Sequence, residues 1–184
     1  MLGASFCLLG AGSVAFVTHK EQNNTFCVSC HLPDRSGPLH GQKFQRFMAR
    51  PPVDLTAAHQ AKARTKCIDC HGGVGVVERA QVLGVAAWDT LRYLADRYKE
   101  PEGMRLPLGD ADCRWCHTDL DKRVTQAREE EQDYHKIFAH LTVKLRCAQC
   151  HVSHVEGLPT FYSMRRETVL PLCKRCHPQI GETL

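Results

Sequence analysis

The feature that most constrains this chain is the pattern Cys-x-x-Cys-His, which occurs five times within 184 residues. The chain contains 11 cysteines, and all but one of them belong to this pattern. The copies are formed by Cys27, Cys30 and His31; Cys67, Cys70 and His71; Cys113, Cys116 and His117; Cys147, Cys150 and His151; and Cys173, Cys176 and His177. Only Cys7 lies outside the pattern, so any account of the fold must first explain these segments.

This pattern is the attachment site of haem c. Two thiols separated by two residues reach the two vinyl groups at one edge of a porphyrin, and the adjacent histidine then lies under the iron as its proximal ligand. Zinc sites and redox dithiols also use Cys-x-x-Cys, but neither requires a histidine directly after the second cysteine. Every Cys-x-x-Cys in this chain has that histidine, so we expect five covalent haem c groups.

The composition indicates that cofactors form most of the interior. Hydrophobic residues make up 43% of the chain and aromatic residues only 7%, which is little to surround five macrocycles. We therefore expect a mainly α-helical chain with little regular secondary structure, wrapped around stacked haems, in one pentahaem cytochrome c domain over residues 19–184. Each haem brings two propionates, so the formal charge of +4 does not indicate a basic protein, and no basic stripe predicts nucleic-acid binding.

An uncharged, apolar run from Leu2 to Thr18 precedes this domain. As a helix it would extend roughly 25 Å, at the short end of what crosses a bilayer. Ser13 to Ala15 resembles a signal-peptide cleavage site, but we favour a retained transmembrane helix over residues 1–18. Its glycines and alanines would let another helix approach closely, which predicts an integral membrane subunit as partner.

Two further helices are predicted between the motifs. Apolar residues recur at helical spacing from Val74 to Tyr98, and Pro101 ends the pattern. This amphipathic helix would pack on haems or, alternatively, lie against a membrane surface or a partner. A second helix is expected from Asp119 to Leu145, with the acidic run Glu129 to Glu131 in solvent.

The histidines outside the motifs decide the mechanism. They are His19, His40, His59, His135, His140 and His154. We expect the last four, together with one of the first two, to bind the distal faces of the irons. Met48, Met104 and Met164 are alternatives, each of which would raise the potential of its haem. Two protein ligands on every iron leave no position for a substrate, so we predict no catalytic residues and a non-catalytic role in electron transfer.

Longer stretches around the motifs resemble a known family. The N-terminal run followed by Thr25 to His31, and His59 ahead of Cys67 to His71, resembles the NapC/NirT/NrfH family of membrane-anchored multihaem cytochromes. The segments Cys113 to His117 and Cys147 to His154 are similar to its later sites. This resemblance implies electron transfer from membrane quinol to periplasmic reductases. Five haems with one anchor are also similar to the cytochrome subunit of alternative complex III or quinone reductase complexes, in which another subunit handles the quinone.

Together these expectations predict a membrane-anchored pentahaem cytochrome. It would transfer electrons between the quinone pool, directly or through a partner membrane subunit, and periplasmic redox proteins. The alternatives are a soluble-side periplasmic shuttle, a filament subunit or, less favoured, a multihaem reductase. We expect the chain at the periplasmic side of a bacterial or archaeal cytoplasmic membrane, because haem c is attached on that side. Quinol is a further expected ligand at or near the membrane.

Overall fold

The computed structural model describes residues 2–29, 39–99, 101, 103–120, 122, 134–157 and 164–181, with side chains from Gly10 onward. Its elements are α1 (Leu2–Lys20), α2 (Asn24–Ser29), α4 (Leu39–Phe47), α5 (Leu55–Ala63), α6 (Cys67–His71), α7 (Gly75–Leu94), α8 (Asp110–Arg114), the 3₁₀ turns η1 (Tyr134–Lys136) and η2 (Phe138–Thr142), α10 (Cys147–Cys150) and α11 (Arg166–Lys174). In these ranges β structure is limited to isolated bridge residues, as in the bridge between Asp54 and Glu156. The predicted mainly helical class is therefore confirmed.

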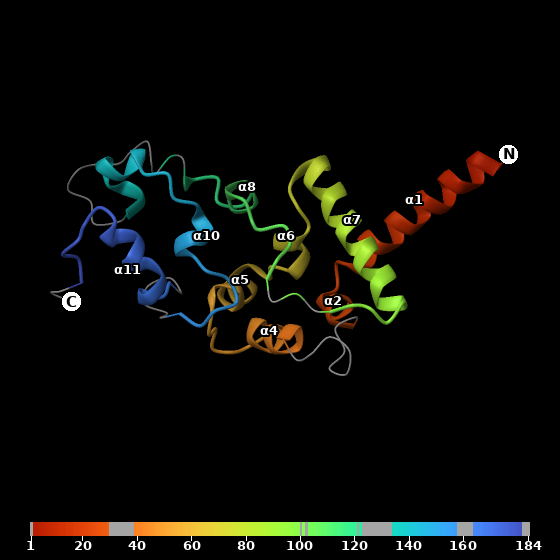
Figure 1. Cartoon of the computed structure of the whole chain (residues 1–184), viewed down its shortest axis with the longest axis horizontal. Coiled ribbons are helices and arrows are strands. Elements are labelled where there is room, and N and C mark those ends of the chain that lie inside the picture. Colours follow the sequence, from red (N-terminus) through yellow and green to blue (C-terminus); the bar gives the residue numbers. More distant parts are fainter. Residues whose placement is uncertain are drawn as a thin grey trace.

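The short helices that carry the cysteine motifs follow one another along the longest axis of the molecule. Figure 1 shows α2, α6, α8, α10 and α11 in this order, from the end near α1 to the end near the C-terminus. Most of these helices are single turns or little more, because each is only long enough to present one motif. The chain thus extends as a row of sites and not as a bundle around one centre.

Very few side chains are removed from solvent. Among the described residues, the buried hydrophobic side chains are Phe47, at the end of α4, and Ala57, in the first turn of α5. A soluble domain of this length normally buries a far larger apolar core. The polypeptide alone does not form such a core, which agrees with the expectation that cofactors supply the missing apolar surface.

The predicted transmembrane helix over residues 1–18 is not supported. The run does form a helix, α1, but none of the helices in the described part of the chain is long and apolar enough to cross a membrane. The last turn of α1 carries two basic residues, His19 and Lys20. At that end Glu21, which is only 8% exposed, forms an ion pair with Arg79 of α7.

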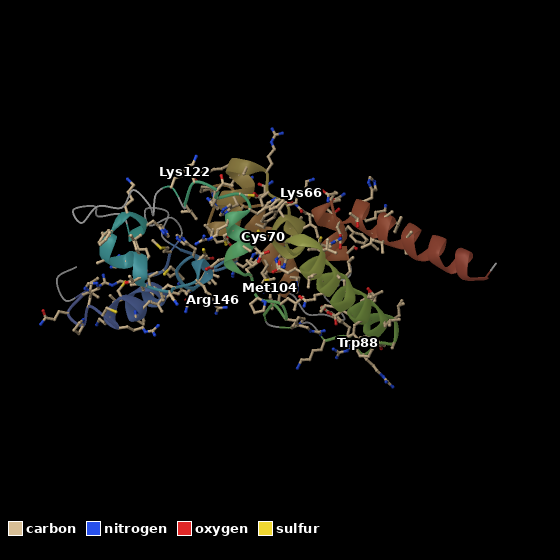
Figure 2. The ribbon with its side chains drawn as sticks, turned by 90° about the horizontal axis from the view of Figure 1, so that it is seen from above. Lys66, Cys70, Trp88, Met104, Lys122 and Arg146 are labelled. Atoms are coloured by element: carbon tan, nitrogen blue, oxygen red, sulfur yellow. The ribbon has the colours of Figure 1, made fainter. Side chains whose placement is uncertain are left out.

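The helix predicted from Val74 to Tyr98 is present as α7, although it ends four residues earlier, at Leu94. It ends there because Asp96 adopts a left-handed conformation (φ 55°) that interrupts the helical path. Figure 2 shows Trp88 at the outer edge of the molecule, and this side chain is 59% exposed. The apolar face of α7 is therefore not covered by described parts of the polypeptide at this position.

The helix predicted from Asp119 to Leu145 is wrong over its second half. Residues 134–142 form the turns η1 and η2, separated by Ile137, and Val143 is extended (ψ 112°). The β-branched side chains of Ile137 and Val143 disfavour a continuous helix here. Residues 123–133, including the acidic run, lie outside the described residues.

Candidate haem sites

In each described motif, one helical turn brings the histidine to the same side of the chain as the first cysteine. The backbone N–H groups of His117, His151 and His177 donate to the carbonyl oxygens of the first cysteine of their own motif, at 2.9–3.0 Å. Residues four apart in such a turn lie on the same side of the chain. The two thiols and the imidazole of a motif are thereby directed to one side, as a covalently attached haem requires. None of the nine described motif cysteines is in a disulfide.

The first two motifs are joined directly. The backbone N–H of Cys67 donates to Oδ1 of Asn24 at 2.9 Å, and Asn24 lies three residues before Cys27. The thiols of Cys27 and Cys67 also form a hydrogen bond, which lowers the pKa of Cys27 to about 7 and raises that of Cys67. Both contacts involve the first cysteine of a motif, so the two motifs meet at the same edge.

The third and fourth motifs are joined in the same way. The backbone N–H of Cys147 donates to Oδ1 of Asp110 at 2.9 Å, and Asp110 lies three residues before Cys113. The thiols of Cys113 and Cys147 again form a hydrogen bond. Burial and the hydrogen bond to the Asp110 carboxylate raise the pKa of Cys147 to about 12. The chain therefore contains two pairs of motifs built on one plan.

The second motif also lies close to the third, and the fourth motif lies close to the fifth. Burial raises the pKa of Cys70 to about 11, and the nearby thiols of Cys113 and Cys116 add to this effect. At the next junction, burial and the thiol of Cys173 raise the pKa of Cys150. Cys70 lies near the middle of the molecule in Figure 2, between the N-terminal and C-terminal helices. The five motifs thus adjoin in their order along the sequence.

Four motif histidines each lie opposite a histidine from outside the motifs. The ring centroids are separated by 5.9 Å for His59 and His117, 6.2 Å for His71 and His154, 6.2 Å for His135 and His151, and 6.0 Å for His140 and His177. Two imidazoles on opposite sides of one metal ion have centroids roughly 6 Å apart when each metal–nitrogen bond is about 2 Å. The side chains present therefore fit a haem iron between each pair.

Hydrogen bonds orient two of the distal rings. Nδ1 of His59 lies 2.8 Å from the carbonyl oxygen of Leu55, one turn earlier in α5, so this nitrogen carries the proton and Nε2 remains for a metal. Nδ1 of His154 lies 3.3 Å from Oγ1 of Thr56. His154 adopts a left-handed backbone conformation (φ 56°), which costs about 1–3 kcal/mol and is found mostly where function requires it.

Burial lowers the pKa values of three of these histidine rings. Burial, aided by His154, lowers the pKa of His71 to about 4, and burial also lowers the pKa values of His151 and His154. Neutral imidazole is the form that binds a metal. These rings would thus need no proton release to bind iron at neutral pH.

The first motif is only partly described. Cys30 and His31 lie outside the described residues, as does the Cys7 side chain. His19 is exposed on α1, whereas His40 is half-buried on α4, which packs against α2, the helix that carries Cys27. Of the alternative methionine ligands, Met48 is 45% exposed and Met104 is 41% exposed.

Sequence reasoning missed the residues that support the ligands. Asn24 and Asp110 were visible only as an amide or carboxyl three residues before a motif, and nothing in the sequence connects Thr56 to His154. The first two could have been found by aligning the motifs on their upstream residues. Thr56 could not, because the contact joins distant parts of the chain.

A comparison with protein families adds independent support. The family model of cytochrome c3 matches residues 97–178, less than half of the chain. This segment contains the last three motifs and the histidines His135, His140 and His154. The match supports a multihaem c-type cytochrome. No curated protein and no solved structure matched the chain. The match to this cytochrome family does not distinguish the membrane-linked families that the sequence resembles.

Proposed function

We propose that the chain is a pentahaem electron-transfer cytochrome in which two histidines hold each iron. The observation that carries this proposal is the set of four facing histidine pairs with ring centroids 5.9–6.2 Å apart. Isolated surface or core histidines would not meet motif histidines repeatedly at the separation that one metal ion imposes. The match to cytochrome c3 over residues 97–178 supports the same function for three of the sites.

The proposed ligand pairs follow from these separations. The second to fifth sites would be held by His71 with His154, His117 with His59, His151 with His135, and His177 with His140. For the first site we propose His31 with His40, because α4 packs against α2 whereas His19 is exposed. The ten motif cysteines would form the thioether bonds.

In the proposed mechanism, bound haem supplies reversible one-electron chemistry. Two histidines per iron occupy both axial positions and exclude a substrate. The hydrogen bonds from the Cys67 N–H to Asn24 and from the Cys147 N–H to Asp110 would hold the first motif beside the second and the third beside the fourth. Because successive motifs adjoin from α2 to α11, the polypeptide supports a continuous row of sites between the two ends of the molecule (Figure 1).

We further propose that the α1 end of this row receives electrons at a bacterial or archaeal cytoplasmic membrane, from quinol or an integral partner subunit. Three observations support this: the run from Leu2 to Thr18 is uncharged, residues 10–16 are exposed, and α1 projects away from the rest of the chain. A projecting apolar helix with small residues suits docking onto another helix. A periplasmic redox protein would accept electrons at the α11 end.

Two measurements test the electron-transfer function. The mass of the denatured protein should equal the polypeptide plus five haems, and low-temperature EPR of the oxidised protein should show only low-spin iron. A load of fewer haems, or high-spin signals from several sites, would contradict the proposal and favour a reductase with open coordination. Membrane docking is tested separately: the protein should need detergent for release, and deletion of residues 2–18 should abolish reduction by quinol but not by dithionite.

A further inference from the structure

Two hydrogen bonds, here called the relay, connect His154, a proposed distal ligand, to Asp54 through Thr56. The Thr56 hydroxyl donates to Oδ1 of Asp54 at 2.7 Å. Its oxygen therefore accepts from Nδ1 of His154, 3.3 Å away. His154 thus donates to Thr56, and Thr56 donates to Asp54. The Asp54 carboxylate therefore lies two hydrogen bonds from a proposed iron ligand.

Asp54 is fully removed from solvent, with 0% of its surface exposed. Its Oδ1 also accepts the backbone N–H of Ala57 at 2.8 Å, which caps α5. Its Oδ2 has no hydrogen-bond partner among the described residues. Water does not screen a charge at such a position, so the carboxylate acts strongly on groups bonded to it.

The backbone holds this relay in place from two sides. Asp54 forms the isolated bridge with Glu156, and the N–H of Gly157 donates to the carbonyl oxygen of Val53 at 3.4 Å. The segment with Asp54 and Thr56 is therefore tied to the segment that carries His154. The relay is a built feature and not a chance contact of two mobile side chains.

Other distal histidines have different surroundings. Nδ1 of His59 donates to a neutral acceptor, the carbonyl oxygen of Leu55. Nδ1 of His140 is buried without a hydrogen-bond partner among the described residues. Of these three rings, only His154 is linked to a carboxylate. The electron density that each imidazole donates to its iron should differ accordingly.

We propose that Thr56 and Asp54 are positioning residues that lower the reduction potential of the site formed by His71 and His154. A ligating imidazole becomes more basic when its other N–H donates to a hydroxyl that in turn donates to a carboxylate, and this favours ferric iron. Lys43 of α4, which helps lower the pKa of both rings, opposes this effect through space. The relay differs from Lys43 in that it is hydrogen-bonded to the ligand itself. The inference rests on the proposed function, since it requires a haem at this site.

The test is a potentiometric titration of the fully loaded full-length protein, followed by EPR. Thr56→Val removes the hydroxyl with little change in shape, and Asp54→Asn removes the charge while keeping a side chain that caps helices well. Each should raise the potential of one haem and leave the others unchanged. A tenfold change in the reduction equilibrium of that haem corresponds to about 59 mV. Thr56→Ser should restore the original potential.

Thr65→Val is the matched control, because the Thr65 hydroxyl donates to the carbonyl oxygen of His59 and not to an imidazole. Haem load and low-spin signals are measured first, and their loss in the unmodified protein would contradict the proposed function. With five low-spin haems present, unchanged potentials in both Thr56→Val and Asp54→Asn would overturn the relay. Equal shifts in the control, or shifts of every haem, would also overturn it.

Discussion

The imidazole of His59 in α5 faces the imidazole of His117 in the third motif, with ring centroids 5.9 Å apart and planes at 89°. His59 lies outside the segment matched by the cytochrome c3 family, and His117 lies inside it. In the opposite direction, His71 of the second motif faces His154 of the matched segment. Each half of the chain therefore places a histidine opposite a motif histidine of the other half, as the proposed exchange of distal ligands requires.

Replacement of His59 tests this exchange. We expect His59→Ala to convert one haem from low-spin to high-spin, because the iron above His117 loses its distal ligand. EPR should show one high-spin signal with the other sites unchanged. The altered haem should be the third, identified by combining the change with His117→Ala, which should add no further high-spin site. If the second haem became high-spin instead, His59 would serve the motif nearest to it in the sequence.

The first site distinguishes His40 from His19. We expect His40→Ala to produce one high-spin haem, because α4 packs against the helix that carries Cys27. His19→Ala should leave the spectrum low-spin, since that side chain is exposed. The same EPR measurement on both variants provides the control. The reverse result would move the distal ligand of the first site to α1.

The hydrogen bonds that join motifs in pairs should contribute to stability. Asn24→Ala and Asp110→Ala each leave a half-buried cysteine N–H without its acceptor, so each should lower the free energy of unfolding by about 1 kcal/mol. Urea unfolding of the haem-loaded variants measures this. Gln22→Ala is the control, because the side chain of Gln22 accepts an exposed hydrogen bond from the Lys66 ammonium, and loss of this bond should have little effect. An equal loss for all three variants would contradict a special role of the pairing bonds.

The ion pair between Glu21 and Arg79 should fasten α1 to α7. The two side chains are 11% and 24% exposed, so Arg79→Ala would leave a mostly buried carboxylate without its partner. We expect a loss of about 1–2 kcal/mol, less than for a fully buried pair. Limited proteolysis should cleave faster between α1 and α2. Arg165→Ala, which breaks the exposed pair with Glu167, should change the unfolding free energy by less than about 1 kcal/mol.

The helical class and the motif geometry could be predicted because they depend on neighbours along the chain. Cys-x-x-Cys-His places its three side chains within one turn, and the periodicity of α7 is likewise local. Residues 134–142 were misassigned because hydrophobic and polar residues alternate there in a pattern that a helix also produces. The apolar run of α1 was predicted as a transmembrane segment from its lack of charge, but none of the helices in the described part of the chain is long and apolar enough to span a bilayer.

By itself, the sequence predicted which residues carry the chemistry: the motif cysteines, the motif histidines and a short list of further histidines. Tertiary structure alone decided how those histidines pair. His59 lies shortly before the second motif, and His140 lies shortly before the fourth. They nevertheless face the histidines of the third and fifth motifs, His117 and His177. The physical reason is that an iron would hold two imidazoles on opposite faces of a haem, with their ring centroids about 6 Å apart. A histidine a few residues from a motif lies on the wrong side, so the partner must come from another part of the chain.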